Sequence, residues 1–479
     1  MVNGQVPSAL SVRGAAAEAG DRLALMAGAR RWTWAEMAAA VGSERGRLDA
    51  AAALGGGAPI RRVAFDAHPS AESVIRLLAL VEAGVCAVPL DPRLPASVRA
   101  ERIRLLAPVF DVDAGTSIDA TSETSEPGAT GGLRWRRRPG APAAPTSPLA
   151  ILFTSGTTGA PRAVELSRSA FRASAAASTA HLGWQPEDRW LCCLPLAHVG
   201  GLSIIIRCLV GRRAVALAGG FDAATVALQM ERDEVTLASF VPTMLRRLFD
   251  VDQAWRASPS LRAALLGGAP ADGELWDEIA RRRFPALATY GMTETCAQVA
   301  TARPGAPRRL IPLDGVELRI TRDRIEVAGP MLCTRVGFEA DDDGTWTHDG
   351  FLRTEDLGRL ADGVLEVTGR ADGAIITGGQ NVAPTAVEVV LLTHPAIRRA
   401  AVFGVPDEEW GEIVGAALEE SGVAPRPDAA ELRAWLAARL APYERPRRVA
   451  WVRELPESLS GKLDRSAACE QWGRTMEVV

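Results

Sequence analysis

The sequence predicts an α/β protein with a large N-terminal domain of mostly parallel sheets and helices and a small α+β C-terminal domain. Three observations lead to this fold class. Between about residues 150 and 300, strand-like runs alternate with amphipathic helical runs, which is typical of a parallel sheet. Polar or glycine-rich motifs directly follow these strand-like runs, where parallel sheets bind ligands. After Gly350, hairpin signals replace the alternation.

The first elements of the alternating region follow from local patterns. Residues 149–153 predict a strand that leads into a loop of Ser, Thr and Gly. Asp222 can cap a helix that carries Val226 and Met230 on one face. Residues 235–240 predict the next strand.

The second half of this region continues the pattern. Pro242 indicates the start of a short helix, because proline is favoured in the first helical turn. Residues 261–266 predict a strand, residues 274–283 an amphipathic helix, and residues 286–290 another strand. Strand and helix therefore alternate up to the motif that begins at Tyr290.

The C-terminal part has a different order of predicted helices and strands. Residues 385–454 predict helix, strand, strand, helix and strand, which gives domains over residues 1–369 and 370–479. Turn residues at 342–344 and at Asp362-Gly363 predict hairpins. Residues 114–150, rich in small polar residues and proline, predict a surface insertion with a solvated basic loop. The arginines of that loop are Arg134, Arg136, Arg137 and Arg138.

Composition excludes several classes of protein. Of 479 residues, 47% are hydrophobic and 23% charged, which excludes wholesale disorder. A formal charge of −4 argues against a nucleic-acid binder. No apolar run reaches the length of a membrane span, and no signal peptide is evident, so we expect a cytoplasmic protein. The seven cysteines lack a C-x-x-C spacing and predict reduced, mostly buried thiols, and the five scattered histidines predict no zinc site.

Lysine occurs only once, at Lys462, although lysine and arginine together number 54. We interpret this as compositional drift that has replaced lysine by arginine wherever arginine serves. An ammonium is a compact point charge, whereas a guanidinium is a wide planar fork. A functional role for Lys462 is therefore favoured over chance survival.

Four motifs indicate chemistry on a nucleotide. The first is a Gly/Thr-rich loop whose N–H groups and hydroxyls suit phosphate oxygens, formed by Thr154, Ser155, Gly156, Thr157, Thr158 and Gly159 and followed by Arg162. In the second, Tyr290 can stack on a base, while Thr293 and Glu294 can contact a phosphate and Mg²⁺. The third pairs Asp356 with Arg370, and the fourth presents Lys462 after Gly461. Taken singly, the second and third also suit ordinary polar turns.

Together, the motifs resemble the acyl-adenylate-forming enzymes over nearly the whole chain. The resemblance implies a large domain, a small mobile domain, Mg²⁺, and ATP and CoA as co-substrates. It implies that Gly267, Gly268 and Ala269 line the adenine and acyl pocket with Tyr290 on the adenine. Thr154 to Gly159 would hold pyrophosphate, Thr293 the α-phosphate, Glu294 the Mg²⁺, and Asp356 with Arg370 the ribose. Asp372 would be the hinge, Lys462 the adenylation lysine, and Gly378 and Gly379 would serve the thioester step.

Within this family, the resemblance is strongest to the o-succinylbenzoate–CoA ligases of menaquinone biosynthesis. It rests on the stretches 195–203 and 292–298, and it implies that His198, Gly291 and Gln298 lie on the substrate side. Read without the family, His198 is equally well a buried structural histidine. Departures from the family pattern include Arg162, which keeps a positive charge, and Glu355, which adds a negative charge near the ribose. None removes a catalytic group.

The sequence and this resemblance thus predict an ATP-dependent acid–CoA ligase that adenylates the small carboxylic acid o-succinylbenzoate and transfers its acyl group to CoA, with neither nucleic acid nor a membrane span involved. The alternatives are a ligase for another aryl or medium-chain acid, an adenylation domain that serves a carrier protein in trans, and an adenylate-binding protein without turnover. Lys462 and Glu294 argue against the last. Whether the chain forms a homo-oligomer is left open.

Overall fold

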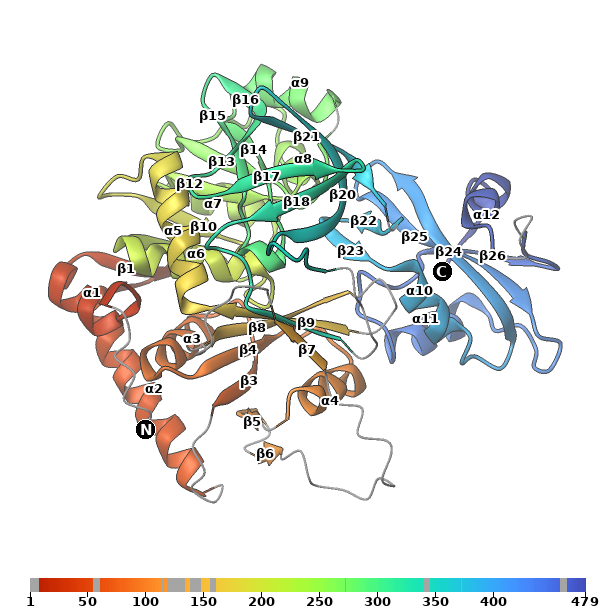
Figure 1. Ribbon diagram of the computed structural model, residues 1–479, viewed down its shortest axis with the longest axis horizontal. Coiled ribbons are helices and arrows are strands. Elements are labelled where there is room, and N and C mark those ends of the chain that lie inside the picture. The colour runs from red at the N-terminus through yellow and green to blue at the C-terminus, as the bar shows by residue number, and fades with distance from the viewer. Residues whose placement is uncertain are drawn as a thin grey trace. The chain divides into compact units, whose positions relative to one another are not determined.

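The computed structural model describes residues 8–54, 61–107, 109–113, 116–118, 134–137, 148–155, 161–271, 273–338, 345–371, 373–456 and 463–479. The chain separates into two compact units. Unit 1 comprises Met1–Pro92, Ile103–Phe153 and Ala163–Gly369, and unit 2 comprises Arg93–Arg102, Thr154–Arg162 and Arg370–Val479. The fold class is α/β, as the sequence predicted (Figure 1).

The larger sheet of unit 1 runs in the order β17-β18-β20-β21-β16-β15-β14-β13-β12-β10-β11-β1-β2. Strands β1, β11, β10, β12, β13 and β14 pair in parallel, and the strands beyond β14 pair antiparallel. The bounds are β1 Leu23–Ala27, β2 Arg30–Thr33, β10 Arg189–Cys192, β11 Ala214–Leu217, β12 Leu237–Phe240, β13 Ala263–Leu266, β14 Ala286–Tyr290, β15 Ala300–Arg303, β16 Ala306–Pro312, β17 Glu317–Thr321, β18 Arg324–Ala328, β20 Leu352–Ala361 and β21 Val364–Arg370.

A second sheet of unit 1 runs in the order β6-β5-β3-β4-β8-β9-β19-β7. Its strands are β3 Arg62–Asp66, β4 Cys86–Leu90, β5 Val109–Asp111, β6 Thr116–Ile118, β7 Arg134–Arg137, β8 Pro148–Ser155, β9 Pro161–Ser167 and β19 Arg335–Phe338. The helices of unit 1 are α1 Val12–Ala19, α2 Trp34–Leu54, α3 Ala71–Ala83, α5 Arg168–Leu182, α6 Val199–Gly211, α7 Ala223–Arg232, α8 Pro242–Asp250 and α9 Gly273–Arg282, and α4 Ala96–Leu105 crosses the division between the units.

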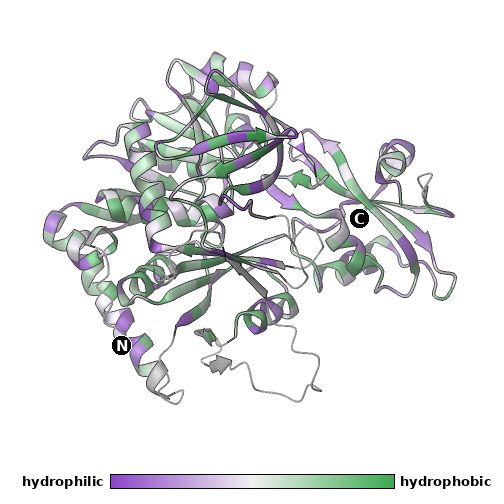
Figure 2. Cartoon of the chain, viewed as in Figure 1, coloured by the Kyte–Doolittle hydropathy of each residue, from purple (hydrophilic) through white to green (hydrophobic). Residues whose placement is uncertain are grey.

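Alternate residues of the parallel strands enter two different cores. On β13, Leu265 joins the core that contains α5 and α6, whereas Leu266 joins the core that contains α7, α8 and α9. Leu237 and Ala238 on β12 divide in the same way. Because successive side chains of a strand point to opposite faces, a sheet covered by helices on both faces needs apolar residues at every position. The parallel strands β11 and β13 accordingly consist of hydrophobic residues alone, whereas other strands also carry hydrophilic residues (Figure 2).

Unit 2 contains a sheet in the order β23-β22-β25-β26-β27, with β24 also pairing with β25. Its elements are β22 Ile375–Thr377, β23 Gln380–Val382, α10 Pro384–Leu391, β24 Ile397–Asp407, β25 Gly411–Glu420, α11 Ala429–Ala437, β26 Arg448–Val452, α12 Arg465–Trp472 and β27 Glu477–Val478. The predicted series of helix, strand, strand, helix and strand is therefore confirmed as α10, β24, β25, α11 and β26.

Local predictions in the alternating region are also confirmed. The Asp222 carboxylate caps α7 by accepting a hydrogen bond from the Thr225 N–H at 2.9 Å. Asp362 and Gly363 join β20 to β21 with φ values of 49° and 71°, the left-handed pair that a tight hairpin requires. The hairpin signal at 342–344 lies outside the described residues.

The prediction of a basic loop within residues 114–150 is wrong at residues 134–137, because these residues form a strand. Residues Arg134–Arg137 form β7, an edge strand paired antiparallel with β19 from Arg335↔Arg137 to Phe338↔Arg134. Composition favoured a loop, but the open edge of β19 offers backbone partners that local sequence cannot reveal.

All seven cysteines are free thiols; six are buried and Cys469 is partly exposed, in agreement with the sequence analysis. Among the helices that the structure describes, none is both long and apolar enough to span a bilayer.

Candidate active site

The first part of the site lies where β13 and β14 end. These parallel neighbours pair in the register Leu266↔Ala288, so Gly267 follows β13 beside the last residues of β14. A Cβ atom on Gly267 would lie 2.7 Å from Thr289 Cγ2 and 2.8 Å from Thr289 O, which leaves no room for a side chain. Gly268 has φ +80°, a conformation that favours glycine. The Gly267-Gly268 turn is therefore fixed by sterics at the carboxyl edge of the sheet.

Gly291 starts an even tighter turn. A Cβ atom there would lie 1.4 Å from the carbonyl oxygen of Ala297, so glycine is the only residue the turn accepts. The turn closes through hydrogen bonds from Ala297 N–H to Met292 O at 3.1 Å and from Val299 N–H to Tyr290 O at 2.9 Å. This loop presents the two residues predicted to meet phosphate and metal.

Thr293 and Glu294 lie in a short 3-10 helix within this turn. Glu294 is 8% exposed, and its carbonyl accepts the Cys333 N–H at 2.7 Å, which fixes the backbone beneath the carboxylate. In the part of the chain that the structure describes, no three His, Cys, Asp or Glu side chains converge on one point. A carboxylate oxygen suits Mg²⁺, and this ion commonly takes its remaining ligands from phosphate and water. Glu294 therefore fits a nucleotide-bound Mg²⁺ rather than an all-protein metal cage.

Tyr290 and Asp356 come together, although 66 residues separate them in the sequence. The Tyr290 hydroxyl donates a hydrogen bond to Asp356 Oδ2 at 2.8 Å. Asp356 lies on β20 and is 9% exposed. Its N–H donates to Thr354 Oγ1 at 3.1 Å, and that hydroxyl donates to Ile325 O at 2.8 Å. The residues predicted for adenine and ribose thus form one anchored pair.

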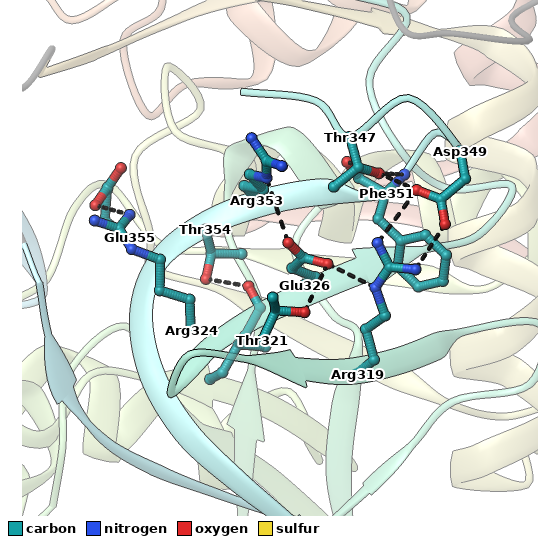
Figure 3. Close-up of polar contacts among 11 residues, drawn as sticks. Arg319, Thr321, Arg324, Glu326, Thr347, Asp349, Phe351, Arg353, Thr354 and Glu355 are labelled. Carbon is teal, nitrogen blue, oxygen red and sulfur yellow. Dashed lines mark hydrogen bonds and ion pairs between the residues drawn. The ribbon is translucent and has the colours of Figure 1, made fainter. Parts of the chain in front are cut away.

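Glu355 faces away from this pair. Neighbouring residues of a strand project to opposite faces, and the Glu355 carboxylate forms an ion pair with Arg324 on β18 (Figure 3). The adjacent Glu326 is almost fully buried, and Arg319 Nε donates to its carboxylate at 2.6 Å. The extra negative charge that the sequence placed near the ribose is therefore paired with a guanidinium.

The predicted substrate-side residues differ in their surroundings. His198 occupies the N-cap position of α6, and its Nε2 lies 3.9 Å from Oδ2 of the buried Asp91. Gln298 is 3% exposed and its amide already has protein partners: Oε1 accepts from Ser178 at 3.0 Å and Nε2 donates to Thr301 at 2.9 Å. The Gln298 amide is therefore held by Ser178 and Thr301, and its direct contact with substrate stays a prediction.

The sequence analysis did not include Arg207 among the candidate site residues, although the structure links this residue to the Gly291 loop. This α6 residue is 3% exposed, and burial lowers the pKa of its guanidinium to about 10. Nη2 donates to Ser174 at 3.3 Å, the guanidinium lies 5.7 Å from the Trp190 ring, and Nε has no hydrogen-bond partner among the described residues. Ser174 in turn donates to Cys296 O at 2.9 Å, which links Arg207 to the Gly291 loop. The sequence does contain a pattern that indicates a buried charge, because Arg207 is the single charged residue in the apolar run 202–210.

Ala269 follows Gly268 in unit 1, and the remaining predicted residues belong to unit 2. The Thr154 hydroxyl donates to Arg162 O at 3.4 Å, so the residues that flank the predicted phosphate loop are hydrogen-bonded to each other. Arg370 ends β21, and Gly378 and Gly379 turn between β22 and β23 with φ +56° and +79°. Backbone alone is described for Ser155. Predicted residues outside the described part are Gly156, Thr157, Thr158, Gly159, Asp372 and Lys462.

The described residues on either side of 457–462 are firmly held. Asp464 N–H donates to Pro456 O at 3.0 Å, and the Asp464 carboxylate caps α12. Arg465 donates two hydrogen bonds to the Glu388 carboxylate, at 2.7 and 2.6 Å. Glu388 is 7% exposed and also accepts the Val402 N–H at 2.9 Å. The chain on both sides of Lys462 is therefore anchored within unit 2.

This fold, with nucleotide-type motifs at the carboxyl edge of its parallel strands, is that of an adenylate-forming ligase. The chain belongs to the AMP-binding enzyme family. Residues 12–330 match the AMP-binding enzyme domain, and residues 386–462 match the AMP-binding enzyme C-terminal domain.

Within this family, the chain is similar to several ligases of known name. The 2-succinylbenzoate–CoA ligase of Bacillus licheniformis is 38% identical over 335 residues, which is 66% of this chain and 68% of that protein. The structure of o-succinylbenzoate CoA synthetase from Bacillus subtilis with a product analogue has a TM-score of 0.80 at 30% identity, and the match covers 96% of this chain and 97% of that one. The same enzyme with ATP and a magnesium ion matches with a TM-score of 0.63 at 30% identity over 95% and 98%.

A relative with a different activity is equally similar in fold. The amide bond synthetase from Marinactinospora thermotolerans matches with a TM-score of 0.82 at 27% identity over 96% of this chain and 99% of that one. Similarity of fold alone therefore does not decide which acceptor takes the acyl group.

Proposed function

We propose that this chain is an Mg²⁺- and ATP-dependent acid–CoA ligase that converts o-succinylbenzoate into its acyl-adenylate and then into its CoA thioester. The observation that carries the proposal is the Tyr290–Asp356 pair, which is held beside the Gly291 turn. The relatives named above support the same activity, because the Bacillus enzymes are o-succinylbenzoate ligases and one was solved with ATP and a magnesium ion.

The first half-reaction joins two anions. A carboxylate oxygen of the acid attacks the α-phosphorus of ATP, forms the acyl–phosphate bond and expels pyrophosphate. Negative charge accumulates at the reacting atoms and needs positive partners in a dry site. Mg²⁺ bound beside Glu294 would supply one such charge. Lys462 supplies the other, and its narrow ammonium can approach an oxygen of each reactant.

The described residues hold the nucleotide for this attack. The Tyr290 ring stacks on the adenine while its hydroxyl orients Asp356, whose carboxylate takes the ribose hydroxyls together with Arg370. Thr293 contacts the α-phosphate, and the Thr154 to Gly159 loop with Arg162 holds the departing pyrophosphate. Gly267, Gly268 and Ala269 leave space for the adenine and acyl group. Because the Tyr290–Asp356 pair and the Gly291 turn are preformed, little binding energy is lost in ordering them.

In the second half-reaction, the CoA thiolate attacks the acyl carbon and AMP leaves. We propose that one site performs both steps, with domains over residues 1–369 and 370–479 and a hinge at Asp372. In this scheme Lys462 serves adenylation, whereas Gly378 and Gly379 serve thioester formation.

The choice of acid rests on Arg207. o-Succinylbenzoate has two carboxylates, one of which is activated, so the other must be accommodated in the acyl pocket. A buried anion needs a cation to offset its lost hydration. Arg207 is a buried guanidinium without a carboxylate partner among the described residues, and it is linked through Ser174 to the Gly291 loop. Benzoate and octanoate have no second carboxylate, so a dicarboxylic acid suits this pocket better. His198 then faces the acyl chain.

Pyrophosphate release with ATP, Mg²⁺ and a panel of acids tests the proposal. The panel contains o-succinylbenzoate, benzoate and octanoate, each with and without CoA. We expect o-succinylbenzoate to be fastest and its CoA thioester to appear by mass spectrometry. A faster reaction with another aryl or medium-chain acid would leave the chemistry standing and refute the substrate. Acyl-AMP without a thioester would indicate another acceptor, and no pyrophosphate from any acid would indicate an adenylate-binding protein without turnover.

Arg207→Gln separates the substrate from the mechanism. Removing the guanidinium should raise KM for o-succinylbenzoate at least tenfold and leave KM for ATP unchanged. The matched control is Arg213→Gln, just beyond the same helix. If Arg207→Gln impaired the turnover of benzoate as much as that of o-succinylbenzoate, Arg207 would maintain the fold rather than bind a second carboxylate.

A further inference from the structure

Unit 1 has a cavity at the opposite end of the strands that carry the nucleotide motifs. It has a volume of about 500 Å³, a size typical of small-molecule sites. Its walls are α9 from Trp276 to Ala280, residues Arg283 to Leu287 that lead into β14, and the turn between β15 and β16. Because β14 leads from Ala286 to Tyr290, the cavity and the adenylate site lie at opposite ends of one strand.

The inner wall of the cavity is apolar and aromatic. Trp276 and Phe284 line it and are 9% and 5% exposed, so each presents only part of its ring. Ile279 and Pro285 extend the apolar wall. Flat apolar surfaces of this kind favour a planar ring system, which gains contact area without losing much conformational freedom.

The arginines that line the cavity differ in whether an acidic partner neutralises them. Arg262 lies in the wall, but its Nε donates to Asp188 at 2.9 Å, so that guanidinium is already neutralised. Arg283 and Arg308 have no ion-pair partner within the described residues, and the Arg308 guanidinium lies 5.6 Å from the centroid of the Trp276 ring. Asp277 is the only acid in the lining. One net positive charge therefore remains beside an aromatic wall.

From this combination we propose that the cavity is a second ligand site, separate from the adenylate site, that binds a small aromatic carboxylate. The ring contacts Trp276 and Phe284, and the carboxylate lies between Arg283 and Arg308. Guanidinium groups suit this role because their parallel N–H donors match the two oxygens of a carboxylate. The proposal is independent of which acid the enzyme activates.

Calorimetric titration of the full chain with 2-naphthoate, and with the uncharged 2-naphthalenemethanol, tests the site. Ala280 lies on the exposed edge of the cavity, so Ala280→Phe should fill the space without disturbing the core. We expect this variant to lose the naphthoate affinity. Arg283→Gln and Arg308→Gln should each weaken naphthoate at least fivefold and change the alcohol little.

Arg309→Gln is the matched control. Arg309 is the next residue on β16, so it projects to the other face of the strand and does not line the cavity. Its affinity for 2-naphthoate should equal that of the unmodified chain. Unchanged naphthoate binding by a folded Ala280→Phe variant would overturn the proposal, because binding would then be at another site. Failure of the unmodified chain to bind 2-naphthoate at millimolar concentration would overturn it as well.

Discussion

The two units hold their proposed catalytic segments by different forces. In unit 1, Gly291 packs so tightly against Ala297 that no Cβ fits, and the turn is fixed by sterics and backbone hydrogen bonds. In unit 2, the chain beyond Lys462 is fixed mainly by charge, through Arg465 and Glu388. Added volume should therefore damage the first region, whereas lost charge or added salt should damage the second. The following predictions test this difference, from the largest expected effect to the smallest.

Lys462→Arg should have the largest effect. The guanidinium keeps the charge but is too wide for the position proposed for the ammonium, so acyl-AMP formation should fall about a hundredfold or more. Conversion of supplied acyl-AMP to the CoA thioester should continue at the original rate. Both rates are measured on one preparation, and parallel loss of both would refute the division of labour between the half-reactions.

Gly291→Ala should cost about 3 kcal/mol of folding stability or an equivalent distortion of the site, because its Cβ would overlap the Ala297 carbonyl. Gly42→Ala on α2 is the control, since a Cβ there meets nothing within 4 Å and alanine favours a helix. Thermal unfolding and pyrophosphate release are measured for both. If Gly291→Ala were as stable and active as Gly42→Ala, unit 1 would not be sterically fixed.

Asp188→Asn tests the buried charges of unit 1. Burial alone would raise the pKa of Asp188, but hydrogen bonds from Arg262, Gln185 and Thr236 outweigh it and hold that pKa below its usual range. A carboxylate with a lowered folded pKa stabilises the protein above its unfolded pKa of about 4 and loses that contribution as pH falls through the folded value. The variant should be less stable by about 2 kcal/mol at pH 7.

The difference between this variant and the unmodified chain should shrink below pH 4 and change little with salt, because the pair is shielded from solvent. Urea unfolding at several pH values measures it. A difference that stays constant down to pH 2 would contradict the assignment.

Glu388→Gln tests the charged anchor of unit 2. Glutamine keeps an acceptor for Val402 but loses the ion pair with Arg465, which is partly exposed, so the cost should be about 1 kcal/mol. Adenylation should slow more than thioester formation, and 0.5 M NaCl should reproduce part of the effect in the unmodified chain. Arg426→Gln, which breaks the exposed pair with Glu477, is the control. Equal slowing of both half-reactions would show that the pair does not serve adenylation specifically.

Arg324→Ala should have the smallest effect. It leaves the Glu355 carboxylate unpaired next to Asp356, which should raise KM for ATP about threefold. Glu355→Gly in the same background should restore the original KM, because the unpaired charge is then removed. No recovery in the double variant would mean that Arg324 acts through packing instead.

The sequence predicted those parts of the molecule that local chemistry determines. The cap at Asp222, the turn at Asp362-Gly363 and the order of elements in unit 2 follow from neighbouring residues, and all are confirmed. The contact between Tyr290 and Asp356 could not be derived locally, because it depends on the order in which β14, β20 and the strands between them are arranged in one sheet. The role of each predicted site residue stays a prediction.

Two features escaped the sequence analysis for the same reason. The pairing of β7 with β19 depends on an edge that exists only in the folded sheet. The burial of Arg207 depends on α5 and β10 packing around α6. In a chain whose basic residues are almost all arginines, one further arginine does not stand out by residue type.

The unequal exposure of the thiols has a practical consequence. Burial raises the pKa of Cys86 and Cys192 to about 12, so at pH 7 these thiols resist alkylation, and the other four buried thiols are equally shielded. Cys469, at the end of the chain that carries the proposed catalytic lysine, is the one thiol within reach of a reagent. A maleimide dye should therefore attach at one position in the unmodified protein, and its emission would report on unit 2 as substrates are added.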